Sequence, residues 1–177
     1  HPIEFGQSFN RPSEKMMRKA RNQAGPRMFE ADEIHNILSR TDPILKAMVL
    51  LGINCGFGNT DVASLPQTSV DLDSGWVEFP RPKTEIRRRI PLWPETVAAL
   101  REALAIRPEP TDSTDADLCF VTLKRNRFVR VQESKRTPGK FVTINAVARR
   151  FDPIVKKLGI NGRKGLGFYT LRHTFAT

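Results

Sequence analysis

The side chains best suited to chemistry stand together near the C-terminus, in the stretch GFYTLRHTFAT. Arg172 and His173 are adjacent there, and Tyr169 is the only tyrosine of the chain. A guanidinium stays charged at any working pH, and its planar fork pairs two oxygens of one phosphate. The pattern alone also fits a simpler structure, a helix that packs Leu171 and Phe175 on the core and leaves both basic side chains in solvent.

The residues LRHTFAT resemble the second conserved box of the tyrosine recombinase, or phage integrase, family, which reads close to H-x-x-L-R-H-T-F-A. The resemblance implies that Arg172 binds the scissile phosphate and that His173 lies among the DNA-binding residues. Tyr169 replaces the box histidine, a catalytic position; a phenol can donate a hydrogen bond to phosphate but is a poor base at neutral pH. In the family the attacking tyrosine follows this box, so we expect the nucleophile beyond Thr177 and not at Tyr169.

A second stretch, CGFGNTDVASL, resembles box I of the family, roughly T-G-L-R-x-S-E-L-x-x-L. The glycine, the acid and the closing leucine match, at Gly56, Asp61 and Leu65. The arginine position, however, holds Gly58. In the family this arginine is the other half of the phosphate clamp, and losing one of two convergent cations raises the barrier by a few kcal/mol. Either a neighbouring cation fills the gap, with Lys83 and the cluster Arg87–Arg89 as candidates, or the phosphate site is half built.

A basic hairpin is predicted between the two boxes. Residues 76–79 and 87–92 read as strands, joined by a loop that two prolines stiffen. Five of the nine residues 81–89 are Lys or Arg, although such charges often serve only to protect a sheet edge. The resemblance makes Lys83 the general acid toward the leaving 5′-oxygen. The arginines expected to contact DNA are Arg81, Arg87, Arg88 and Arg89; since successive strand residues alternate faces, we expect one or two of the last three to bind phosphate and the others to pair with acids.

The composition points to a polyanionic partner. The formal net charge is +10 and the isoelectric point is about 10.2, which favours nucleic acid. The excess is concentrated in residues 81–89, 124–140 and 149–164, which favours one basic face; Lys124, Arg125 and Arg127 are further expected DNA contacts. An RNA-binding module explains the charge as well, but it does not explain two family motifs in order.

Apolar spacing predicts the elements that position these residues. Helices are expected over Ala31–Ser39, Pro43–Asn54, a stretch from Pro94 onward, and Thr143–Leu158 with Thr143 as its cap and Pro153 inside. The second of these has almost no polar face and should be the buried central helix. A short strand is expected over residues 118–121. Residues 124–140 show no apolar period and are predicted to form a mobile loop.

The predicted fold is α+β and mainly helical, with a small antiparallel sheet, of the type of DNA breaking-rejoining catalytic domains. Residues 28–177 form that domain, and residues 1–27 a basic interdomain linker, read either as a strap along DNA or as a disordered tail. A short helix from Pro12 to Asn22 fits this linker. Cys55 and Cys119 read as core thiols of a reducing compartment and not as a disulfide or metal site. With no signal peptide and no membrane span, a cytoplasmic location is expected.

The resemblance implies no metal or nucleotide cofactor. It implies duplex DNA as the partner, with other recombinase protomers on that DNA as a further partner. Two functions remain open for the chain. One is a working site-specific recombinase that cleaves and rejoins DNA through a phosphotyrosine. The other is a DNA-binding relative that has lost strand cleavage.

Overall fold

The computed structural model describes residues 12–23, 28–82, 84–160 and 165–175. Its centre is helix α3 (Pro43–Cys55), which is buried on nearly every side. Asp42 caps its first turn by accepting hydrogen bonds from the Ile44 and Leu45 amides at 3.1 and 3.2 Å, and Pro43 takes the first helical position. Gly56, with φ of 64°, ends the helix in a left-handed conformation that suits glycine. The predicted central helix is confirmed.

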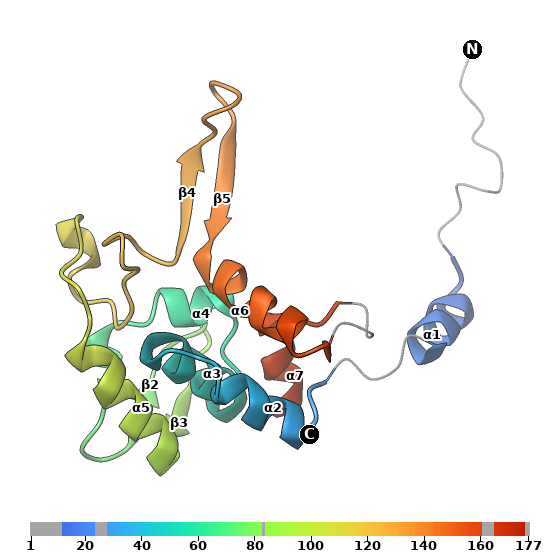
Figure 1. Cartoon of the computed structure of the whole chain (residues 1–177), viewed down its shortest axis with the longest axis horizontal. Helices are drawn as coiled ribbons and strands as arrows, with labels where there is room; N and C mark the ends of the chain where they lie inside the picture. Colours follow the sequence, from blue (N-terminus) through green and yellow to red (C-terminus); the bar gives the residue numbers. More distant parts are fainter. Residues whose placement is uncertain (1–11, 24–27, 83, 161–164, 176–177) are drawn as a thin grey trace.

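Helices α5 (Pro94–Ala105) and the short α7 (Leu171–Phe175) pack extensively on α3. Helix α2 (Ala31–Leu38) adds Ile37 to the same core (Figure 1). The helix α7 approaches closely because α3 carries Gly52 at the contact. A Cβ on Gly52 would lie only 3.0 Å from the Cβ and Cδ1 atoms of Leu171. This close approach fixes the position of Arg172, the residue after Leu171.

The small sheet has the antiparallel order β1 (Val70–Asp71), β2 (Trp76–Glu78) and β3 (Arg89–Pro91). In its register Val77 pairs with Ile90, and Val77 is fully buried. The side chain of Asn54 ties this sheet to α3, since its amide donates to the Pro91 carbonyl at 3.1 Å and its oxygen accepts from the Trp93 amide at 2.8 Å. The predicted basic hairpin is present, and its second strand is shorter than expected.

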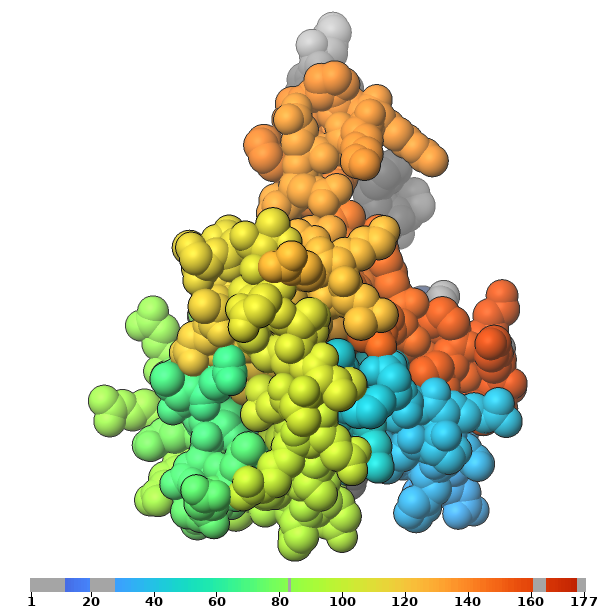
Figure 2. All heavy atoms as spheres, turned by 60° about the vertical axis from the view of Figure 1, so that its left-hand side comes forward, coloured from blue at the N-terminus to red at the C-terminus, as the bar shows by residue number. Residues whose placement is uncertain are grey.

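A second hairpin corrects the prediction of a mobile loop over residues 124–140. Strands β4 (Val129–Glu133) and β5 (Phe141–Asn145) pair antiparallel and project from the body of the domain (Figures 1 and 2). Its far end is exposed, including Val131 and Phe141. Without burial to reveal a period, the alternation of Val129, Arg130, Val131 and Gln132 was hidden among charges.

Helix α6 (Ala146–Lys157) also departs from the prediction, because it begins three residues later than the expected Thr143. Thr143 and Ile144 belong to strand β5, and the cap is Asn145, whose oxygen accepts from the Ala148 amide at 3.0 Å. The helix runs through Pro153 unbroken; Pro153 and Arg149, whose carbonyl loses its donor, are both exposed to water. Residues 118–121 form two isolated bridges and no strand.

An aromatic cluster seats the C-terminal segment on α6. The ring of Phe151 packs edge to face against Phe29 and against Phe168, at centroid distances of 5.9 and 5.5 Å. Phe168 opens the 3-10 turn η5 (Phe168–Thr170), which leads into α7. Further short elements are α4 (Asn59–Ala63), η2 (Gln67–Ser69) and η3 (Ser113–Asp115).

The basic N-terminal segment contains helix α1 (Glu14–Gln23), in the region where a short helix was expected. Figure 1 shows it apart from the rest of the domain. The linker role of residues 1–27 stays a prediction. None of the helices in the described part of the chain has the length and apolar character needed to cross a bilayer.

The two cysteines are free thiols buried in the core. Burial raises the pKa of Cys55 and of Cys119 to about 12 in each case. They therefore stay protonated and inert at neutral pH, as core thiols do.

Candidate phosphate-binding site

The segments that resemble box I and box II both contribute residues to one open cavity of about 430 Å³. The start of α4, the loop of the basic hairpin, the cap of α6 and the turn η5 with α7 each contribute to its wall. The residues that line it are Gly58, Asn59, Thr60, Asp61, Arg81, Pro82, Asn145, Tyr169 and Arg172. A polar cavity of this size with guanidinium groups in its wall can hold a phosphate.

Arg172 is held in the cavity wall by the end of α3. Its Nη1 donates to the Gly56 carbonyl at 3.0 Å and lies 4.0 Å from the Asp61 carboxylate. The side chain is 30% exposed. One face of the guanidinium is therefore anchored, and the partial exposure leaves donors for a ligand. The simpler structure, a solvated Arg172, is wrong, whereas Leu171 does pack on the core as expected.

Gly58 faces the same cavity, which agrees with the predicted alignment of box I with Arg172. Its backbone is extended, with φ of −90° and ψ of −179°, a conformation open to any residue. The space in front of it is occupied by Tyr169, because a Cβ on Gly58 would lie 3.1 and 3.2 Å from the Cδ2 and Cε2 atoms of that ring. Position 58 thus lacks the arginine, and an aromatic ring lies where the arginine side chain would begin.

Asp61 links the parts of the site. One carboxylate oxygen accepts from the Gly58 amide at 2.8 Å, and the other pairs with Arg88 at 3.2 Å. The same carboxylate lies beside Arg172, and its side chain is only 11% exposed. The sequence identified Asp61 as a match to box I but did not indicate that it connects two arginines.

Arg88 is held by intramolecular contacts, and its expected contact with DNA stays a prediction. Its side chain is 15% exposed and pairs with Asp61, while Nε donates to the Phe79 carbonyl at 3.1 Å. The guanidinium also lies over the Phe57 ring, at 4.6 Å. The sequence predicted that some of the arginines 87–89 pair with acids, and Arg88 does so with Asp61.

The remaining cluster residues lie at the surface. Arg87 and Arg89 are exposed, and Arg89 stacks over Trp76 at 4.6 Å. Arg81 is half-buried and lines the cavity. Lys83, the expected general acid, lies outside the described residues. The roles of Lys83, Arg81, Arg87 and Arg89 toward DNA stay predictions.

His173 lies beside Tyr169, a residue of the cavity wall. The two rings meet edge to face with centroids 5.7 Å apart, and His173 is exposed while Tyr169 is 49% exposed. The structure thus brings Arg172, Tyr169, Gly58 and Arg81 together. It adds Asn145, which sequence reasoning missed. An asparagine directly before the helical run AVARRF is a capping signal that would have indicated it.

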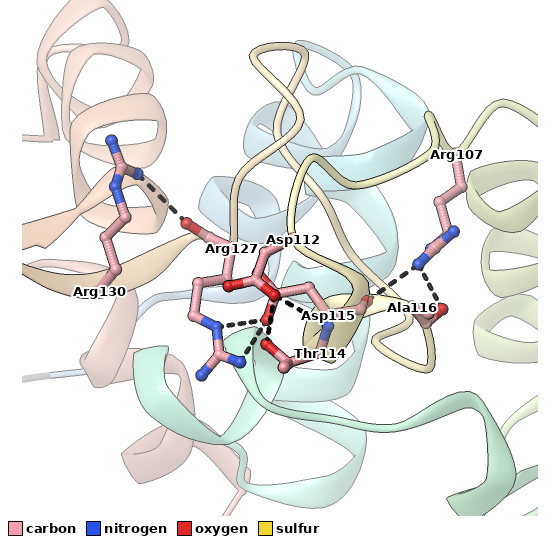
Figure 3. Close-up of polar contacts among 7 residues, drawn as sticks. All are labelled: Arg107, Asp112, Thr114, Asp115, Ala116, Arg127 and Arg130. Atoms are coloured by element: carbon pink, nitrogen blue, oxygen red, sulfur yellow. Dashed lines mark hydrogen bonds and ion pairs between the residues drawn. The ribbon is translucent and has the colours of Figure 1, made fainter.

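Arg125 and Arg127, expected at DNA, make intramolecular contacts. Figure 3 shows the Arg127 guanidinium against the Asp115 carboxylate, with Nε at 2.7 Å, and this hydrogen bond raises the pKa of Arg127 above its usual value. Arg107 anchors the same loop by donating to the Asp115 and Ala116 carbonyls. The Nε of Arg125 donates to the Glu109 carbonyl at 2.7 Å. Their DNA contacts stay predictions.

A second, basic hollow of about 350 Å³ lies at the base of the projecting hairpin. It includes Lys124, one of the expected DNA residues. The cations that line it are Lys124, Arg130, Arg149 and Arg150, and no acid lines it. Arg150 is paired with Asp42, the cap of α3. Sequence reasoning found the charge here but not the hollow, because its residues come from a turn, a strand and a helix.

Within residues 12–23, 28–82, 84–160 and 165–175, no three His, Cys, Asp or Glu side chains are grouped as a metal site would require.

The mainly helical architecture, with small antiparallel sheets, is that of the catalytic domains of DNA breaking-rejoining enzymes. The chain belongs to the phage integrase family, whose family model matches residues 27–177. Among curated proteins, no sequence matches this chain.

Solved structures of recombinases share the fold. An XerA recombinase superposes with a TM-score of 0.65 at 24% identity, over 86% of this chain and 50% of that one. A lambda integrase dimer bound to a COC′ core site gives 0.60 at 17%, over 84% and 39%. The Tn1549 transposon integrase in complex with circular intermediate DNA gives 0.61 at 16%, over 85% and 53%. At such identities the likeness shows the fold alone, and the chain spans about half of these proteins or less.

Proposed function

We propose that residues 28–177 are the DNA-binding catalytic domain of a phage-integrase-like site-specific recombinase. The observation that carries the proposal is the cavity in which Arg172, Tyr169 and Arg81 converge. A backbone phosphate in this cavity receives two or more hydrogen bonds from Arg172, whose far side is fixed by Gly56 and Asp61. The DNA complexes of lambda and Tn1549 integrases support duplex DNA as the partner, and the lambda dimer supports further protomers on it.

The chemistry proposed for the site is phosphoryl transfer to a tyrosine outside the cavity wall described above. Arg172 stabilises the charge that develops on the phosphate oxygens, and Tyr169 donates its hydroxyl hydrogen to one of them. Lys83 protonates the departing 5′-oxygen. The covalent phosphotyrosyl link conserves the bond energy and makes the step reversible.

A second candidate, a DNA-binding relative without cleavage, is favoured by one observation. The position of the box I arginine is occupied by Gly58 and covered by the Tyr169 ring, so the cavity lacks one charge that the reaction uses. This candidate shares the phosphate cavity with the first and differs only in the chemical step.

DNA binding is tested with a fluorescent duplex titrated at several salt concentrations. If about 5 phosphates are neutralised, log K falls against log salt with a slope near −4 to −5. A slope of zero would contradict both candidates. Cleavage is tested in the natural full-length protein on nicked duplex DNA: a covalent protein-DNA adduct supports the recombinase, and its absence supports the binder.

A further inference from the structure

At position 58, where the family has the box I arginine, the cavity wall carries no cation. The backbone at Gly58 carries no side chain, and the Tyr169 ring fills the nearest space. A phosphate bound to Arg172 has further oxygens that need donors, because burying part of a phosphate without one is costly. The loop of the basic hairpin forms another part of the cavity wall.

We propose that Arg81 is the second cation of this site and binds the same phosphate as Arg172, in place of the absent box I arginine. The inference rests on the proposed function and deepens it. Arg81 and Arg172 are the only Lys or Arg among the described residues that line the cavity. The two residues come from different elements, Arg81 from the hairpin loop and Arg172 from α7.

Among the described residues, the other cations of the hairpin are engaged elsewhere or do not line the cavity. Arg88 is held by Asp61 and the Phe79 carbonyl. Arg89 stacks on Trp76. Arg87 is exposed and is not part of the cavity wall.

The backbone of Arg81 is fixed by a closed turn. Its amide donates to the Ile86 carbonyl at 2.9 Å, and its carbonyl accepts from the amides of Thr84 and Glu85 at 3.0 and 2.7 Å. Prolines at positions 80 and 82 restrict the chain on both sides. Among the described residues, the guanidinium itself has no hydrogen-bond or ion-pair partner. The donors of this guanidinium are therefore available to an anion, and its backbone is already ordered.

Asp61 lowers the electrostatic cost of placing two arginines in one cavity. Its carboxylate lines the wall and lies 4.0 Å from Arg172, so it offsets the repulsion between the cations while no phosphate is bound. In this arrangement Asp61 balances the positive charge of the cavity before phosphate binds, and Arg81 and Arg172 bind the phosphate.

The test is a double-mutant cycle on the binding of a fluorescent DNA duplex. Arg81→Gln is compared with Arg87→Gln, which removes the same charge from the same hairpin outside the cavity, each with and without Arg172→Gln. We expect Arg81→Gln to weaken binding about tenfold. Its effect should shrink in the Arg172→Gln background, because both residues hold one phosphate. The effect of Arg87→Gln should be the same in both backgrounds.

Effects of Arg81→Gln that multiply with those of Arg172→Gln, as for Arg87→Gln, would overturn the inference. A second measurement does not depend on DNA. Titration with inorganic phosphate should shift the Nε–Hε NMR signals of Arg81 and Arg172 with one shared midpoint, and a shift of Arg172 alone would also refute the pairing. Wild-type protein that binds phosphate through both arginines but no DNA would instead contradict the proposed function and leave the paired site in place.

Discussion

The Tyr169 ring and a side chain at position 58 compete for the same space. A Cβ on Gly58 would meet two ring atoms of Tyr169 at 3.1 and 3.2 Å, which is tighter than most packing contacts and requires the ring to shift. Because the backbone of Gly58 is extended, the exclusion comes from the ring and not from backbone strain. The two departures from the family boxes, at positions 58 and 169, therefore lie next to each other in the site.

Restoring the arginine alone should fail to restore the clamp. In Gly58→Arg the new side chain must pass the Tyr169 ring, so we expect DNA affinity to rise little. Gly58→Arg combined with Tyr169→His frees the space, and one added phosphate contact should tighten binding about tenfold. Fluorescence anisotropy checks this, with Tyr169→His alone as the control. Equal gains with and without Tyr169→His would show that the ring is no obstacle.

Removing Arg172 should affect both binding and stability. Arg172→Ala loses the hydrogen bond to the Gly56 carbonyl, so we expect the free energy of unfolding to fall by about 1 kcal/mol. DNA binding should weaken about tenfold. Urea unfolding and anisotropy measure the two effects. A loss of several kcal/mol with unchanged DNA binding would mean that Arg172 serves the fold alone.

Asp61→Asn should be strongly destabilising. It leaves the largely buried Arg88 guanidinium without its acid and weakens the contact to the Gly58 amide, so we expect a loss of about 3 kcal/mol. The matched control is Asp73→Asn, which removes the exposed pair with Arg101 and should cost less than about 0.5 kcal/mol. Urea unfolding measures both variants. Similar costs for the two would contradict a structural role for the Asp61–Arg88 pair.

The basic hollow at the base of the projecting hairpin should contribute to DNA binding. Arg149→Gln removes one of its exposed cations, and we expect affinity to fall about threefold to tenfold and the salt slope to shrink by about 1. Lys157→Gln, at the far end of the same helix and outside the hollow, is the control. If both variants lose the same affinity, the hollow adds nothing beyond overall charge.

Neither cysteine should react in the folded protein. Burial raises the pKa of both thiols to about 12, so at pH 8 the reactive thiolate is scarce. A colourimetric thiol reagent should label both only after urea unfolding. In the unfolded chain the thiols lose their protons near pH 9, well below the pKa of about 12 that they have in the folded protein. The buried, protonated thiols therefore stabilise the fold fully below pH 9, and this stabilisation is lost as the pH rises toward 12. Rapid labelling of native protein at pH 8 would show that the core opens.

The helices around the core were predictable because burial leaves a strong pattern. The run from Pro43 to Cys55 has almost no polar residue, and Asp42 and Gly56 mark its two ends. The β4–β5 hairpin was missed because little of it is buried. The start of α6 was misplaced because Ile144, although in a strand, happens to continue the helical spacing of Val147 and Phe151.

Of the candidate site, the sequence predicted only the residues that belong to the two boxes. Arg172 and Gly58 were brought together correctly, since each occupies a fixed position in its motif. The contact of Tyr169 with Gly58 and the burial of Arg88 depend on how distant segments pack, which no local pattern records. Arg88 looks like its exposed neighbours in sequence, and only the approach of Asp61 and Phe57 distinguishes it.

The hydrogen bond from Arg172 to Gly56 joins residues 116 positions apart. Until Leu171 packs on Gly52 and Phe168 packs on Phe151, the Arg172 side chain cannot reach this carbonyl. A chain whose C-terminal segment is not docked therefore keeps its positive charge but lacks the anchored guanidinium of the cavity.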